Sequence, residues 1–453
     1  MDQQIQEQEE NLENHWAISS PVRRVPAEIL CEIFFLTLPW TRRVGNLDVE
    51  QAPWRLGLVC RQWRTTALVL PRLWSSITLY SSLAKAVHPP TMVETHLYRS
   101  ANTPLTVTLN CEDGEFKAFN FSACFNLVFL HSMRWETVRL HLRQSFGGPF
   151  FTHLRTVNGQ LPMLRTLEIT ESMSSPFDID NPSLMGDMFS IAPRLREVLI
   201  STAGEYRRAW LPLPNIQLPW AQLTRLRGAY RSHEEVLWAL RSCPQLVECG
   251  ITLLGQHFTT LDDSRHLTLP NLRHLSVNNP DFLTFITAPS LQELWISGDA
   301  IYHLDNLIQR SSCTLVKLVI DRCSQPSDLI DILRAIPTLT TLFVFISDKA
   351  IARGLFDALK IRGDLTDICL NLTHVAAGGS EGFGINTFVD MVETRWYGDG
   401  LLTRLSFMRT FYTQKVRCGP KARIHKMQSE GLDARFDTAF HPSPQNYFGA
   451  GCP

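Results

Sequence analysis

The chain has 453 residues, of which 44% are hydrophobic, so it exceeds one ordinary domain and can bury a large core. Its 43 basic and 44 acidic residues nearly cancel, which argues against a general attraction to nucleic acid or to an acidic membrane surface. The eleven cysteines are odd in number and scattered, the N-terminus lacks a secretory signal, and no apolar run approaches the ~18 residues of a membrane span. We therefore expect a folded cytoplasmic or nuclear protein with reduced thiols.

The first 20 residues are rich in Gln and Glu and cannot bury much surface, so they are predicted to be a disordered lead. Two amphipathic helices follow. The first begins with Pro26, which suits a first helical turn, and has apolar residues at helical spacing: Ile29, Leu30, Ile33 and Phe34. The second has the same pattern after a polar stretch from Thr41 to Gln51: Leu56, Val59, Cys60, Trp63 and Ala67.

The segment from Val22 to Tyr80 resembles the F-box of a large fungal family. The resemblance rests on four short stretches in the same order and at similar spacing: Val25–Leu30 (VPAEIL), Ile33-Phe34, Val59–Arg64 (VCRQWR) and Pro71–Trp74 (PRLW). The opening Leu-Pro of many members is Val25-Pro26 here, which is a conservative departure.

The resemblance implies a three-helix module at 21–80 that binds a Skp-type adaptor of a cullin-RING ubiquitin ligase. It also implies the residues that contact the adaptor: Pro26, Ile29, Leu30, Ile33, Val59, Cys60 and Trp63. The alternative is that these helices only cap the domain that follows. Two short helices have too little surface to enclose a core alone, so they should pack on something else.

A short phrase of the form Pro-x-Leu-x-x-Leu-x-Ile recurs after Tyr80. Its first Leu stands at 164, 195, 246, 272, 291, 315, 339 and 365, and a degenerate copy places Leu223 between the second and the third. Steps of roughly 19 to 31 residues are typical of leucine-rich repeats, in which stacked short strands bury one continuous core. Further strands are expected at WSSITL, PLTVTL and ETVRLHL, and helices at VLWALRSC, SDLIDILRAI and KAIARGLFDALK.

The predicted fold class is therefore α/β: a small N-terminal helical F-box followed by an irregular leucine-rich-repeat solenoid, or horseshoe. The predicted domains are a lead at 1–20, the F-box at 21–80, the solenoid at 81–410 and a C-terminal tail at 411–453.

Residues that alternate with the inward apolar ones face the concave surface of such a solenoid. The early face is acidic and polar, whereas the later one is aromatic, and exposed apolar patches usually mark interaction sites. The predicted substrate-binding residues are Trp295, Phe343, Phe345 and Lys317. The alternative is that the basic segment after Leu405 covers this patch.

No constellation in the sequence favours catalysis. Gly378–Gly382 (GGSEG) fits the G-x-S-x-G pattern but lacks the strand–turn–helix context that a nucleophile needs. His131, His141 and His153 match no metal spacing, and no C-x-x-C occurs. We expect no catalytic residue, no metal and no cofactor.

The leading hypothesis is a substrate receptor: the N-terminal module binds the Skp-type adaptor of a cullin-RING ligase, and the repeats bind an unidentified protein substrate. Nucleic acid and membranes are not expected partners, because the basic stretch from Lys415 to Lys426 is typical of a solvated tail. The alternative is a leucine-rich-repeat scaffold that binds a protein partner without any ubiquitin role.

Overall fold

The computed structural model consists of two compact units, Met1–Pro219 (unit 1) and Trp220–Pro453 (unit 2). Each unit is described by itself. The structure describes residues 24–38, 47–80, 88–110, 119–143, 155–157, 159–172, 187–203, 216–254, 266–297, 303–321, 326–346, 348–363, 367–379, 385–398, 402, 404–409 and 418–437.

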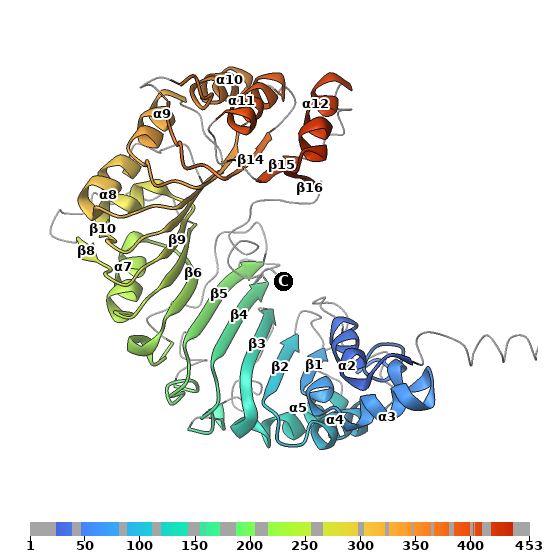
Figure 1. Cartoon of the computed structure of the whole chain (residues 1–453). Coiled ribbons are helices and arrows are strands. Elements are labelled where there is room, and N and C mark those ends of the chain that lie inside the picture. Colours follow the sequence, from blue (N-terminus) through green and yellow to red (C-terminus); the bar gives the residue numbers. More distant parts are fainter. Residues whose placement is uncertain are drawn as a thin grey trace, which may run out of the picture. The chain divides into compact units, whose positions relative to one another are not determined.

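Unit 1 begins with short helices and continues as a parallel sheet (Figure 1). The helices before the sheet are α2 (Ala27–Leu36), η2 (Arg55–Leu58), α3 (Arg61–Val69) and η3 (Pro71–Trp74). The strands pair in chain order and in parallel: β1 (Ser76–Tyr80), β2 (Leu105–Asn110), β3 (Trp135–Arg143), β4 (Thr166–Ser172) and β5 (Glu197–Ala203). The connections between the first three strands contain α4 (Pro89–Arg99), α5 (Phe119–Phe129) and η4 (Ser132–Arg134).

Unit 2 repeats the alternation of strand and helix. Its main sheet is parallel throughout and contains β6 (Arg225–Tyr230), β7 (Glu248–Leu253), β9 (His274–Val277), β11 (Glu293–Ser297), β12 (Lys317–Asp321), β13 (Thr341–Phe345), β14 (His374–Gly379), β15 (Arg404–Arg409) and β16 (Asp433–Asp437). Its helices are η6 (Trp220–Gln222), α7 (His233–Ser242), η8 (Pro280–Phe285), α8 (His303–Ser311), α9 (Pro326–Arg334), α10 (Lys349–Ala358), α11 (Ile385–Tyr397) and α12 (Cys418–Ser429). A separate parallel pair joins β8 (Leu267–Thr268) and β10 (Ile286–Thr287).

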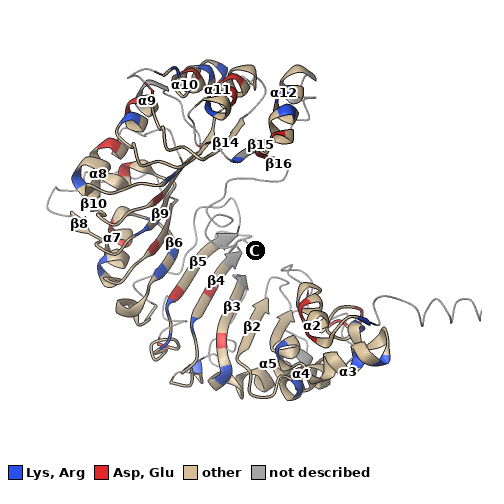
Figure 2. Ribbon diagram, in the orientation of Figure 1, with Lys and Arg blue, Asp and Glu red and all other residues tan. Residues whose placement is uncertain are grey.

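The helices α7 to α12 cover one face of the unit 2 sheet (Figure 1). On β11, Leu294 and Ile296 point toward the helices and are buried. The residues between them, such as Trp295, point to the opposite face, which we call the free face because none of the described helices covers it. Figure 2 shows Lys, Arg, Asp and Glu distributed along the strands of this sheet.

The predicted fold class is wrong. The described residues form a parallel sheet with interleaved helices, and they do not show a small helical N-terminal domain followed by a solenoid. The helices before Ser76 belong to the same compact unit as β1 to β5, because the buried Trp74 of η3 packs against His96 of α4. The general expectation of an α/β fold is consistent with the structure.

Most of the individually predicted strands are confirmed, because β4, β5, β7, β9, β11, β12 and β13 each follow the first Leu of a phrase. The last phrase, from Gly363, is an exception. The strand β14 begins only at His374, so it does not directly follow Leu365 as the phrase predicts. Residues 418–437 lie within the predicted tail and form α12 and β16, and β16 pairs with β15.

Candidate functional site

The N-terminal helices of unit 1 enclose a small hydrophobic core. Leu30 and Phe34, four residues apart on α2, are fully buried with Trp74. The ring of Trp63 packs against Phe34 at a centroid distance of 4.9 Å. This core determines which face of α2 points inward and which face remains outside.

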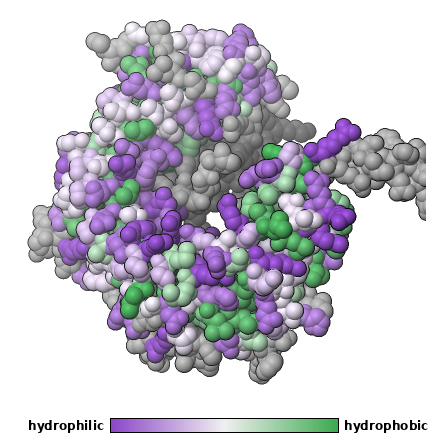
Figure 3. Space-filling view, turned by 60° about the horizontal axis from the view of Figure 1, so that its bottom comes forward, coloured by the Kyte–Doolittle hydropathy of each residue, from purple (hydrophilic) through white to green (hydrophobic). Residues whose placement is uncertain are grey.

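The outer face of α2 is apolar. Ile29, Ile33 and Leu36 lie three or four residues apart and expose 53%, 37% and 75% of their surface. The neighbouring η2 and α3 add Leu58, Val59, Leu68 and Val69, which are also exposed. We call these seven residues the N-terminal apolar surface, and Figure 3 shows hydrophobic residues, drawn green, in the part of unit 1 that contains these helices.

Exposed apolar side chains are concentrated in this segment. Among the described residues, fifteen large hydrophobic side chains are exposed, and eight of them lie between Ile29 and Val69. Scattered single residues of this kind are normal on a protein surface, whereas a cluster marks an interaction site.

The structure divides the predicted adaptor-binding residues into two groups. Pro26, Ile29, Ile33 and Val59 are exposed. The remaining three have structural positions: Leu30 is fully buried, and Cys60 and Trp63 are half-buried. Of the two groups, the first has the larger exposed surface, with 37% at Ile33 and 56% at Val59.

The predicted second helix is interrupted. Cys60 has an extended backbone (φ −159°, ψ 174°) that ends η2 and begins α3, and its Sγ accepts a hydrogen bond of 3.5 Å from the backbone N–H of Trp63. This side-chain cap is the physical reason why the pattern from Leu56 to Ala67 forms two short helices instead of one.

Sequence reasoning missed Leu36, Leu58, Leu68 and Val69 as parts of the apolar surface. The sequence could have identified them, because each is a large apolar residue outside the stripe that the helical spacing assigns to the core. They do not belong to the motif positions on which the resemblance to an F-box rests.

An aromatic cluster joins the N-terminal helices to the sheet within unit 1. Trp54 and Trp74 pack edge to face at 5.1 Å, and each also contacts the His96 ring of α4. The indole N–H of Trp74 donates to the carbonyl of Ala67 at 2.7 Å, and the guanidinium of Arg99 lies 4.3 Å from the Trp74 ring centroid. Contacts of this kind fix the orientation of the helices on the first strand.

The comparisons with known proteins add no identification: no family model matches the chain, and a search of the curated proteins finds no match either. The resemblance of Val22–Tyr80 to an F-box therefore remains a prediction that rests on the sequence motifs.

The predicted substrate-binding residues lie on the free face of unit 2, in neighbouring strands. Trp295 of β11, Val319 of β12, Phe343 of β13 and Ala376 of β14 stand in register and form one cluster. Trp295 and Phe343 expose only 3% and 8% of their surface, so the prediction that both are exposed anchors is wrong. The alternative of a covering segment after Leu405 falls largely outside the described residues.

The other two predicted residues retain exposed surface. Phe345 lies at the end of β13 and is half-buried. Lys317 lies on β12, where its Nζ donates to a carboxylate oxygen of Glu293 at 3.1 Å. The His274 ring, whose Nδ1 lies 3.5 Å from a carboxylate oxygen of Glu293, and the charge of Lys317 lower the pKa of that carboxyl group to about 2. Glu293 is thus ionised at neutral pH, and Lys317 is already paired within the sheet.

The candidate catalytic and metal-binding patterns lie only partly within the described residues. No group of three or more His, Cys, Asp or Glu side chains within the described ranges is placed to hold a metal ion. In the G-x-S-x-G pattern, Gly378 and Gly379 end β14, whereas Ser380 lies outside the described residues, as does His153. None of the helices that the structure describes is both long and apolar enough to cross a membrane.

Proposed function

We propose that this chain is a substrate receptor of a Skp-cullin-F-box type ubiquitin ligase, that it binds the Skp-type adaptor through the N-terminal apolar surface, and that it acts in the cytoplasm or nucleus. The observation that carries the proposal is the concentration of exposed apolar side chains on α2, η2 and α3, in the segment whose sequence resembles an F-box. Such a receptor needs no catalytic residue, because it contributes proximity between a substrate and the ubiquitin-loaded enzyme.

A protein substrate would contact the free face of unit 2 through side chains that still have exposed surface, Phe345 and Lys317. Trp295 and Phe343 would support this surface from below instead of serving as its anchors, since both are buried. Their replacement by Asp would damage the fold, so it cannot test substrate binding.

The adaptor contact is tested with Ile29→Asp/Ile33→Asp, a double variant that changes only exposed residues. Truncation of an anchor residue commonly costs ~2 kcal/mol, so we expect capture by a purified tagged adaptor to weaken by at least about 30-fold. Leu30 is unsuitable for this test because its side chain is fully buried.

A matched control is Val316→Asp/Leu370→Asp, which changes two exposed hydrophobic residues of unit 2 and should leave capture unchanged. Undiminished binding of the folded Ile29→Asp/Ile33→Asp variant would refute the assigned surface. If the wild-type chain fails to bind the adaptor at all, the proposed ligase role is wrong, and a scaffold without a ubiquitin role becomes the better hypothesis.

A further inference from the structure

The exposed charged residues of α2 and of α3, the two helices that supply most of the N-terminal apolar surface, are of opposite sign. On α2, Glu28 and Glu32 are exposed and lie four residues apart. They therefore form a row on the helix surface next to the exposed Ile29 and Ile33. The same helix contains no basic residue. The charges that α2 itself adds to this edge of the surface are therefore acidic, whereas Arg24 precedes the helix and the guanidinium of Arg72 lies 5.0 Å from the Phe35 ring.

The α3 edge carries the opposite charge. Arg61 and Arg64 are exposed and lie on the face that continues to Leu68, and α3 contains no acidic residue. The Nε–H of Arg64 donates to the backbone carbonyl of Gly57 at 2.7 Å, which orients the guanidinium and leaves its two terminal nitrogens available. Figure 2 shows the basic residues of α3 in blue.

These four charges have no ion-pair partner among the described residues. Elsewhere in the structure, neighbouring opposite charges do pair, as Arg55 does with Glu50, and Lys317 with Glu293. Solvated charges of opposite sign on two edges of an apolar surface produce a local dipolar field while the net charge of the chain stays near zero.

We propose that the partner of the N-terminal apolar surface carries a basic edge that faces Glu28 and Glu32 and an acidic edge that faces Arg61 and Arg64. This inference rests on the proposed function and adds the chemistry and orientation of the adaptor's binding face. Complementary rim charges steer the encounter and reject the reversed orientation, whereas the apolar residues supply most of the affinity.

The test is the association rate of the purified full-length chain with the purified adaptor at low and at high salt. We compare wild type with Arg61→Glu/Arg64→Glu and with Glu28→Lys/Glu32→Lys, two variants that shift the net charge by four units in opposite directions. Both should associate more slowly at low salt, by about tenfold, and the difference should shrink at high salt. Glu at the N-terminal end of α3 is favourable for a helix, so the first variant should remain folded.

The outcomes separate the two proposals. If one variant associates faster and the other more slowly, the effect follows net charge, and the proposed pairing of a basic edge with Glu28 and Glu32 and of an acidic edge with Arg61 and Arg64 is refuted. Unchanged rates in both variants refute the proposed arrangement of charges too, while the proposed function stands if Ile29→Asp/Ile33→Asp weakens binding by at least about 30-fold. If the wild-type chain does not bind the adaptor, the proposed function falls and this inference falls with it. Arg194→Glu/Arg353→Glu, which changes two exposed arginines elsewhere, controls for a general charge effect.

Discussion

Ser276 and Ser297 lie on the neighbouring strands β9 and β11, yet their hydroxyl groups have different surroundings. The Oγ of Ser276 is buried and has no hydrogen-bond partner among the described residues, whereas the Oγ of Ser297 donates to a carboxylate oxygen of Asp321 at 3.1 Å. A buried polar group without a partner costs free energy, while a satisfied one stabilises the fold.

We therefore expect Ser276→Ala to leave the free energy of unfolding unchanged or to raise it, and Ser297→Ala to lower it by about 1 kcal/mol. Urea unfolding of the two variants measures the difference directly. The assignment of the two environments would be wrong if Ser276→Ala were the more destabilising change.

Helical spacing predicted that Ile29, Leu30, Ile33 and Phe34 form one apolar stripe of α2. In the structure only Leu30 and Phe34 of this stripe are buried. The stripe contains more apolar residues than the N-terminal core can cover. Periodicity identifies apolar positions but does not say how many of them the rest of the chain can cover, so the division between Leu30 and Ile29 could not be predicted.

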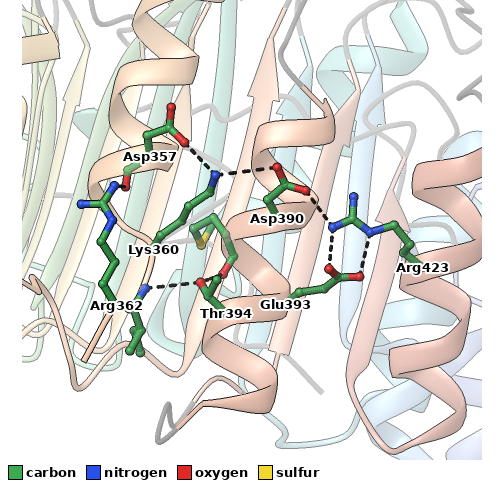
Figure 4. A network of polar contacts seen from close by, with 9 residues as sticks. Asp357, Lys360, Arg362, Asp390, Glu393, Thr394 and Arg423 are labelled. Atoms are coloured by element: carbon green, nitrogen blue, oxygen red, sulfur yellow. Dashed lines mark hydrogen bonds and ion pairs between the residues drawn. The ribbon is translucent and has the colours of Figure 1, made fainter. Parts of the chain in front are cut away.

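Among the elements, the helices at the end of unit 2 are linked by a polar network (Figure 4). Arg423 of α12 donates to Glu393 and to Asp390 of α11, at 2.7 Å in both cases. Lys360, just after α10, lies 2.7 Å from Asp357 and 3.7 Å from Asp390. The hydrogen bonds from Arg423 to Glu393 and Asp390 raise its pKa further above its already high value. Arg423 thus attaches the last helix to its neighbour.

We expect Arg423→Ala to lower the free energy of unfolding by about 1 kcal/mol, because the pairs are partly exposed and solvent screens them. Arg423→Lys should recover little, since an ammonium group cannot reproduce the forked contact. Urea unfolding measures both, and Arg353→Ala of α10, an exposed position, is the control. Equal stability of the Arg423 and Arg353 variants would contradict this role.

Strands were predicted correctly where a short stretch of sequence determines them. The phrases around Leu164 and Leu291 predicted β4 and β11, because an apolar strand pattern follows a Pro-containing turn. The phrase at Leu365 failed because a second, similar phrase around Leu372 precedes the true strand β14. The strand β16 has few apolar residues and pairs only at the end of the sheet, so it carried no signal.

On the scale of the whole molecule, the division into Met1–Pro219 and Trp220–Pro453 was not predictable from sequence motifs. The motif at 21–80 suggested a separate domain, but its core continues to His96 through Trp74. The boundaries of compact units depend on contacts between segments that are distant in the sequence. A sequence motif contains no information on such contacts.

The central claim is that the adaptor binds the N-terminal apolar surface of the intact chain. Backbone amide exchange of the full-length protein, with and without saturating purified adaptor, tests it most directly, because exchange reports every segment at once. We expect the adaptor to slow exchange within α2, η2 and α3, and to leave exchange in β6 to β14 unchanged. The claim would be contradicted if the adaptor left the exchange of α2 and α3 unchanged, or slowed exchange only on the strands of unit 2.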